Sequence, residues 1–158
     1  LTLAQSVLDE ARKRDIKLVT AESCTGGLIA GVLTALSGSS DVVYGGFITY
    51  ANEATETMIG VQETTLINNG AVSVEVAGEM ASGALERSEA DIAISVTGVA
   101  GPSGGSAKKP VGTICFGLAY KDEVLTQKHV FDLGDRHAIR IKTIEHALTM
   151  TLNVMSAD

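Results

Sequence analysis

The stretch IKLVTAESCTGGLIAGVLTAL, residues 16–36, joins two apolar runs through a polar turn and a pair of glycines. Residues 16–21 have the length and composition of a buried strand, and residues 26–36 read as a helix that begins at the glycine pair. Ser23 is therefore expected at a strand-to-helix junction. A serine in that place can form a turn, bind a phosphate or act as a nucleophile.

The same alternation of strand and helix continues along the chain. The pattern predicts strands at residues 42–50, 91–97, 113–120 and 124–131, and helices at the start of the chain, at 52–59, after Ser73 and at the C-terminal end. The last two strands are joined by a tight turn, which favours an antiparallel hairpin. We therefore predict one α/β domain over residues 1–158. It is a three-layer α/β/α sandwich whose mostly parallel sheet carries the antiparallel hairpin at its edge.

Composition narrows the classes of partner and compartment. The 158-residue chain is 45% hydrophobic and carries a formal net charge of -7, which disfavours nucleic acid as a partner. No apolar run approaches the roughly 20 residues that cross a membrane. Cys24 and Cys115 stand far apart without metal-ligand spacing, so a reducing cytoplasm is the expected compartment. The chain begins at Leu1 rather than Met, which fits either trimmed N-terminal sequence or an absent preceding domain.

Ligands of open α/β sheets bind beyond the carboxyl ends of the parallel strands. That rule brings together three segments, residues 22–27, 50–55 and 97–109. The last contains GVAGPSGGSAKKP, residues 98–110, which is too rich in Gly, Ser and Pro for a helix or a strand and has the length of a functional loop. Its glycines do not follow the order of a phosphate-binding P-loop, so on their own they are a weak nucleotide signal.

Several of these features have a structural reading beside the functional one. Ser23 with Gly26 and Gly27 can be a helix cap and a tight turn, or a group of N–H donors for an anion beside a reactive hydroxyl. Arg136 and Arg140 are one helical turn apart and can clamp an anion, although an exposed helix face is the favoured reading.

Other reactive side chains carry weaker signals. We read Cys24 as a small buried residue rather than a nucleophile, and Lys108 as solvated. The three histidines, His129, His137 and His146, lack metal-ligand spacing, so no metal site is expected.

Five separated segments resemble one known family. They are AESCTGG (21–27), GGFITYANEATETMIGV (45–61), NGAVSVEVAGEMASGAL (69–85), VTGVAGPSGGSAKKPVGT (96–113) and GDRHAIR (134–140). Together they resemble the C-terminal domain of the competence/damage-inducible protein CinA, over about residues 20–140. The family includes nicotinamide-nucleotide amidases, which hydrolyse nicotinamide mononucleotide to nicotinate mononucleotide and ammonia. Larger members carry an N-terminal pyrophosphatase domain that has no counterpart here.

The resemblance implies roles for individual residues and a reaction without metal or organic cofactor in a homo-oligomeric protein. It implies Ser23 as nucleophile and Tyr50 as its partner in proton transfer. The expected substrate-binding residues are Thr25, Gly26 and Gly27, whose N–H groups would stabilise the oxyanion, together with Asn52, Gly98, Gly101, Gly104, Gly105 and Lys109.

Position 55 departs from the family pattern. The motif is Tyr-x-Asn-x-x-Lys, and its lysine position is Thr55 here. A neutral lysine can accept the proton of a serine, whereas a threonine hydroxyl cannot. Turnover therefore requires another proton acceptor. The alternative is a weak or inactive paralogue that binds or senses a nucleotide in the competence or DNA-damage response.

Overall fold

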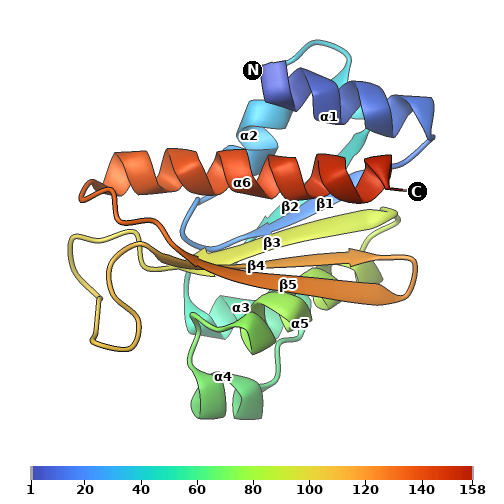
Figure 1. The fold of residues 1–158 in the computed structure, drawn as a ribbon. Helices are drawn as coiled ribbons and strands as arrows, with labels where there is room; N and C mark the ends of the chain where they lie inside the picture. The colour runs from blue at the N-terminus through green and yellow to red at the C-terminus, as the bar shows by residue number, and fades with distance from the viewer. Residues whose placement is uncertain (1, 158) are drawn as a thin grey trace.

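A five-stranded sheet in the order β2-β1-β3-β4-β5 forms the middle layer of the computed structural model, which describes residues 2–157 (Figure 1). The strands are β1 (Leu18–Glu22), β2 (Val43–Ile48), β3 (Ile92–Gly98), β4 (Thr113–Tyr120) and β5 (Glu123–Val130). β1 pairs in parallel with β2 and β3, and β4 runs antiparallel to both β3 and β5. The sheet is thus mixed rather than mostly parallel, because β4 runs antiparallel to β3 as well as to its predicted hairpin partner β5.

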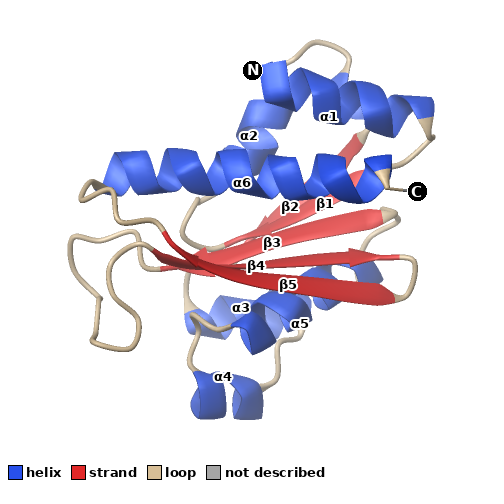
Figure 2. Ribbon diagram, viewed as in Figure 1, coloured by secondary structure: helices blue, strands red, loops and turns tan. Residues whose placement is uncertain are grey.

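Helices cover both faces of this sheet, as Figure 2 shows. On one face lie α1 (Thr2–Lys13), α2 (Leu28–Thr34) and α6 (Arg136–Ser156), and on the other α3 (Asn52–Ile59), α4 (Glu63–Asn69) and α5 (Val74–Glu86). A short 3-10 turn, Ser39–Asp41, leads into β2. The predicted three-layer sandwich is confirmed.

The central strand β3 explains why the two faces differ. Ile92, Ile94 and Val96 belong to the larger core beneath α1, α2 and α6, whereas small residues alternate with them toward α5. The Ser95 hydroxyl donates to the Ala77 carbonyl of α5 at 2.6 Å. Small residues at these positions let α5 lie close to the sheet, so both faces of β3 are buried.

The α4 helix was not predicted from the sequence. It has seven residues and none of them is buried, so the sequence contains no apolar stripe that would predict it. It is held by Glu79 of α5, whose carboxylate accepts from the Gln62 N–H at 2.9 Å and from the Thr65 hydroxyl at 2.6 Å. Tertiary hydrogen bonds rather than local sequence therefore stabilise this helix.

One edge of the sheet collects the segments that matter for function. The carboxyl ends of β1, β2 and β3 lie there because these strands are parallel. The antiparallel register pairs Gly98 with Ile114 and Thr113 with Val130, so the 98–110 loop and the segment that enters α6 reach the same edge. Side chains from four separate parts of the chain can therefore meet.

Candidate functional site

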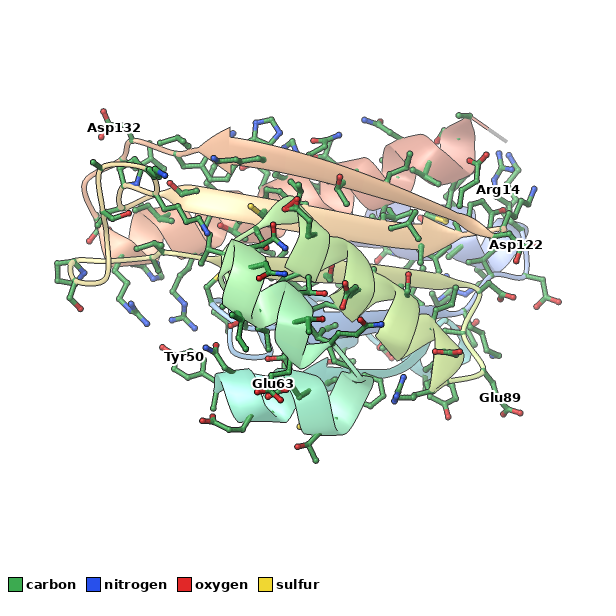
Figure 3. All side chains as sticks on the ribbon, turned by 90° about the horizontal axis from the view of Figure 1, so that it is seen from below. Arg14, Tyr50, Glu63, Glu89, Asp122 and Asp132 are labelled. Carbon is green, nitrogen blue, oxygen red and sulfur yellow. The ribbon has the colours of Figure 1, made fainter. Side chains whose placement is uncertain are left out.

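A cavity of about 210 Å³ lies at this edge. It is lined by the turn after β1, the segment from β2 into α3, the link between α4 and α5, the end of β3 and the residues after it, and the first turn of α6: Ser23, Cys24, Tyr50, Asn52, Ala71, Val72, Thr97, Gly98, Ala100 and Arg136. Four of the predicted site residues are thus brought together: Ser23, Tyr50, Asn52 and Gly98. In Figure 3, Tyr50 lies at one end of the molecule and Arg14 at the other.

The turn that carries Ser23 is closed by its own backbone. The Ser23 N–H donates to the Val96 carbonyl at 3.1 Å, and the Gly26 N–H donates to the Ser23 carbonyl at 3.0 Å. Gly26 and Gly27 have φ values of 60° and 103°, which lie in the left-handed region that side chains disfavour. The glycine pair is therefore required by the turn that presents Ser23.

This geometry corrects part of the predicted oxyanion site. The Gly26 N–H is already bonded to the Ser23 carbonyl and is not free to bind an oxyanion. The N–H groups of Cys24, Thr25 and Gly27 have no hydrogen-bond partner among residues 2–157. Of these three residues only Cys24 lines the cavity; Thr25 is fully buried, and neither Thr25 nor Gly27 is part of the cavity lining.

The start of α2 was expected to offer free N–H groups, and a buried carboxylate already occupies it. Glu22, fully buried at the end of β1, accepts from the Ile29 and Ala30 N–H groups at 2.8 and 3.0 Å. The Thr25 hydroxyl also donates to Glu22, at 2.6 Å. A carboxylate at a helix start is favourable because it binds N–H groups that the helix leaves unpaired. An acidic residue at the end of a buried strand was the sequence signal that could have predicted this contact.

Both arginines of the GDRHAIR segment make contacts around the site: Arg136 is exposed, as expected, and also lines the cavity, whereas Arg140 is half-buried and binds the turn after Ser23. Arg140 donates from Nε to the Cys24 carbonyl and from Nη2 to the Thr25 carbonyl, each at 3.1 Å. Arg136 donates from Nη1 to the Gly101 carbonyl at 2.6 Å and from Nη2 to the Tyr50 hydroxyl at 3.2 Å. Arg136 is the one charged side chain among the described residues that line the cavity.

Thr55 takes no part in the cavity. Its side chain is 5% exposed, and its hydroxyl donates to the Asn52 carbonyl at 2.8 Å and the Ala51 carbonyl at 3.3 Å. Asn52, one turn earlier on α3, lines the cavity, whereas Tyr50 precedes the helix and is 64% exposed. Thr55, at the lysine position of the motif, therefore uses its hydroxyl for hydrogen bonds to backbone carbonyls at the start of α3.

The 98–110 loop contributes less to this cavity than predicted. Gly98 lines it, and the Gly101 carbonyl binds Arg136. Gly104 and Gly105 border a separate, open hollow of about 580 Å³ formed by the loop itself. The Lys109 ammonium donates to the Asn69 carbonyl at the end of α4, at 2.7 Å. None of the predicted residues Gly101, Gly104, Gly105 and Lys109 lines the cavity beside Ser23. Figure 1 shows the loop between β3 and β4 extending away from the sheet.

The neighbouring thiol does not compete with Ser23 as a nucleophile. Burial raises the pKa of the Cys24 thiol to about 12, so the reactive thiolate is scarce at neutral pH. This agrees with the reading of Cys24 as a small buried residue.

Metal chemistry and membrane insertion find little support in the described part of the chain. Residues 2–157 contain no group of three or more His, Cys, Asp or Glu side chains that could hold a metal ion. His129 and His146 do lie together, each with Nε2 within 2.9 Å of the Gln127 side-chain oxygen, but neither lines the cavity beside Ser23. None of the helices in this range is long and apolar enough to span a membrane.

Comparisons with known proteins agree on one family. The family model for the CinA C-terminal domain matches residues 1–155. Two relatives named nicotinamide-nucleotide amidohydrolase PncC are similar: that of Enterobacter agglomerans is 53% identical, covering 84% of this chain and 80% of its own, and that of Escherichia coli K12 is 47% identical, covering 94% and 90%. The crystal structure of competence/damage inducible protein CihA from Agrobacterium tumefaciens aligns with a TM-score of 0.93 at 46% identity, covering 96% of this chain and 94% of that one. The family match spans every segment that lines the cavity.

Proposed function

Because the chain belongs to the CinA C-terminal domain family, we propose that it is a nicotinamide-nucleotide amidase that converts nicotinamide mononucleotide to nicotinate mononucleotide and ammonia. One observation carries the proposal: Ser23 shares a cavity with Tyr50, Asn52 and Gly98, and these four residues come from three separate segments. Relatives that are 47–53% identical bear the name of this activity. No metal or organic cofactor is needed for the reaction as proposed.

The chemistry begins with attack of Ser23 Oγ on the carboxamide carbon. An unpaired N–H group of the turn after Ser23, that of the cavity-lining Cys24 being the nearest in sequence, stabilises the oxyanion of the tetrahedral intermediate. Collapse of that intermediate breaks the C–N bond, and the nitrogen leaves as ammonia with the proton that the serine lost. Water then attacks the acyl-enzyme, which releases the carboxylate product and restores the Ser23 hydroxyl.

Tyr50 is the proposed proton carrier, because no Lys, His, Asp or Glu lines the cavity within residues 2–157. Its oxygen accepts a hydrogen bond from Arg136, so its own O–H remains able to donate to the leaving nitrogen. Thr55 cannot substitute for a base, since its hydroxyl is bonded to backbone carbonyls. Turnover is therefore expected to be slow for an amidase.

The size of the cavity sets the position of the ligand. At about 210 Å³ it is smaller than the roughly 300–1,000 Å³ of typical small-molecule sites, so the pyridine ring enters and the rest of the nucleotide lies at the mouth. Arg136 supplies the positive charge for the phosphate there. The backbone of the 98–110 loop, with Gly101 next to Arg136, is the proposed second wall for this phosphate, and Lys109 would reach it only after leaving the Asn69 carbonyl.

We further propose that residues 1–158 form one domain, that the protein acts in the cytoplasm and that it assembles as a homo-oligomer. Both cysteines are buried and unpaired, which suits a reducing compartment. β5 is an outer strand with a regular register, and its apolar side chains are half exposed: Val124 and Leu125 at 46% and Val130 at 51%. Such an edge favours pairing with a second copy. Light scattering of Leu125→Lys against the unsubstituted protein tests this: a shift to monomer supports the edge as interface, and an unchanged mass refutes it.

The activity is tested by measuring ammonia and nicotinate mononucleotide release from nicotinamide mononucleotide. Turnover that disappears in Ser23→Ala, with the fold intact, supports the proposal. Turnover that survives the substitution refutes Ser23 as the nucleophile. If neither protein turns over the nucleotide and calorimetry still detects its binding, the chain is the binding paralogue rather than an amidase.

A further inference from the structure

We propose that Arg140 is a positioning residue for this site, which holds the turn that presents Ser23 to the cavity. The inference rests on the proposed amidase function. The Arg140 guanidinium reaches from α6 to two successive carbonyls of the turn, those of Cys24 and Thr25, each at 3.1 Å. Arg140 itself does not line the cavity, so it would act through the turn and not on the substrate.

Peptide geometry explains what these two contacts do. In a trans peptide the N–H points away from the carbonyl of the same plane. The Cys24 carbonyl shares its plane with the Thr25 N–H, so its bond to Arg140 turns that N–H away from the guanidinium. The Thr25 N–H has no hydrogen-bond partner among the described residues, and it lies two positions after Ser23. Thr25 is fully buried and does not line the cavity, so this contact fixes the backbone directly after Ser23 rather than aiming a donor at the substrate.

The second contact orients the next peptide plane. The Thr25 carbonyl shares its plane with the Gly26 N–H, which donates to the Ser23 carbonyl at 3.0 Å and closes the turn. Arg140 therefore orients both peptide planes, the one between Cys24 and Thr25 and the one between Thr25 and Gly26 that closes the turn. A Cβ at Gly26 would lie 3.4 Å from Arg140 Nη2, so the bare glycine keeps the guanidinium close to the backbone.

The opposite side of the same turn is held by a carboxylate. Glu22 accepts from the Thr25 hydroxyl at 2.6 Å and from the Ile29 N–H at 2.8 Å. The turn is thereby fixed by an anion on its donor groups and a cation on its carbonyl groups. Without such restraint, two glycines in the left-handed region would leave the backbone mobile. A fixed turn holds the Ser23 hydroxyl in one position, so less reorganisation is needed during reaction.

Arginine suits this role better than lysine. The planar guanidinium presents several N–H donors in a rigid fork and can bond both carbonyls together, whereas a lysine ammonium is a point charge on a flexible stem. We therefore expect Arg140→Lys to restore only part of what Arg140→Gln loses.

The test compares Arg140→Gln, Arg140→Lys and the control Arg14→Gln. Arg14 is also a partly buried arginine, but it pairs with Glu10 on α1 at the far end of the molecule (Figure 3). In Arg140→Gln we expect kcat for nicotinamide mononucleotide to fall about 10- to 1,000-fold, a range bounded above by the loss of one oxyanion donor, with KM changed less than about threefold. Added methylguanidine should restore part of the rate in Arg140→Gln and none in Arg14→Gln.

A second readout separates this inference from the proposed function. Amide hydrogen exchange at Gly26 should accelerate in Arg140→Gln, at an unchanged unfolding temperature, whether or not the protein is an amidase. If the unsubstituted protein shows no turnover, the proposed function fails and this exchange rate decides the role of Arg140. Unchanged exchange at Gly26, or unchanged kcat in an active enzyme, overturns the inference. A kcat that falls only in proportion to the folded fraction, without rescue by methylguanidine, also overturns it.

Discussion

Replacing Thr55 with lysine is expected to convert a slow site into an efficient one. Thr55 and Asn52 are separated by three positions on α3, so their Cβ atoms lie about 5–6 Å apart on one helix face. Asn52 already lines the cavity beside Ser23. We expect the four-carbon stem of a lysine to span that separation and to carry its ammonium beyond Asn52 toward the serine hydroxyl.

The expected gain and its cost follow from the same position. A general base contributes about 10²- to 10⁴-fold in rate, which corresponds to roughly 3–5 kcal/mol of barrier. The substitution removes the hydroxyl that bonds to the Asn52 carbonyl at 2.8 Å and inserts a longer side chain at a site that is 5% exposed. We expect a loss of about 1–3 kcal/mol in the free energy of unfolding. The variant should therefore be more active as long as the loss in the free energy of unfolding leaves the protein folded.

Ammonia release from nicotinamide mononucleotide measures the gain, and denaturant unfolding measures the cost. Thr55→Met supplies a side chain of similar length without the amine and should leave the rate unchanged. Ser23→Ala combined with Thr55→Lys should abolish the gained activity. A rate for Thr55→Lys within about threefold of the starting protein, in a folded variant that still binds the nucleotide, would refute the reasoning that the site lacks only its base.

Three further outcomes are expected. In Gly83→Ala the new Cβ meets the Ile59 carbonyl, so the free energy of unfolding in urea should fall by about 1–3 kcal/mol. In Gly31→Ala the new Cβ has no atom within 4 Å, so this variant should be neutral or stabilising. Equal effects would contradict the close packing of α3 on α5. Cys24 should resist iodoacetamide at pH 8 in the folded protein, because its pKa of about 12 leaves about one thiolate in 10⁴, and rapid alkylation in mass spectra would contradict this. Burial lowers the pKa of His146 below 6.5, so as the pH falls the unfolded chain binds a proton before the folded protein does. The free energy of unfolding should therefore fall as the pH drops below about 6.5. In urea titrations His146→Gln should weaken this pH dependence, and an unchanged dependence would contradict the reasoning.

The reactive group and its immediate neighbours were accessible to prediction because local rules govern them. A buried strand that ends in a polar residue before two glycines predicts a junction, and the structure has Ser23 there with both glycines at positive φ. The rule that ligands bind beyond the carboxyl ends of parallel strands correctly brought Ser23, Tyr50 and Gly98 to one cavity. The proposed roles of these residues in catalysis remain predictions for the assays above.

The surroundings of that group were not accessible in the same way. Glu22 binds a helix start seven positions further along the chain, and Arg140 binds carbonyls more than a hundred positions before it. Such contacts have no local pattern, because a buried carboxylate and an exposed one look alike in sequence. The bond of the Gly26 N–H to the Ser23 carbonyl is local, but it depends on the turn conformation that the positive φ of Gly26 allows, and the sequence alone does not specify that conformation.

By itself the sequence determined the alternation of strands and helices, the layered architecture and the place of Ser23, since hydrophobic periodicity and turn chemistry act over a few residues. Tertiary structure alone decided which hydrogen-bonding groups near Ser23 are free and which are occupied. That distinction depends on the packing of α6 and of the 98–110 loop against the end of the sheet, where Arg136 and Arg140 find their carbonyl partners. Hydrogen bonds between distant segments form only once the strands are in register, and no single stretch of the chain encodes them.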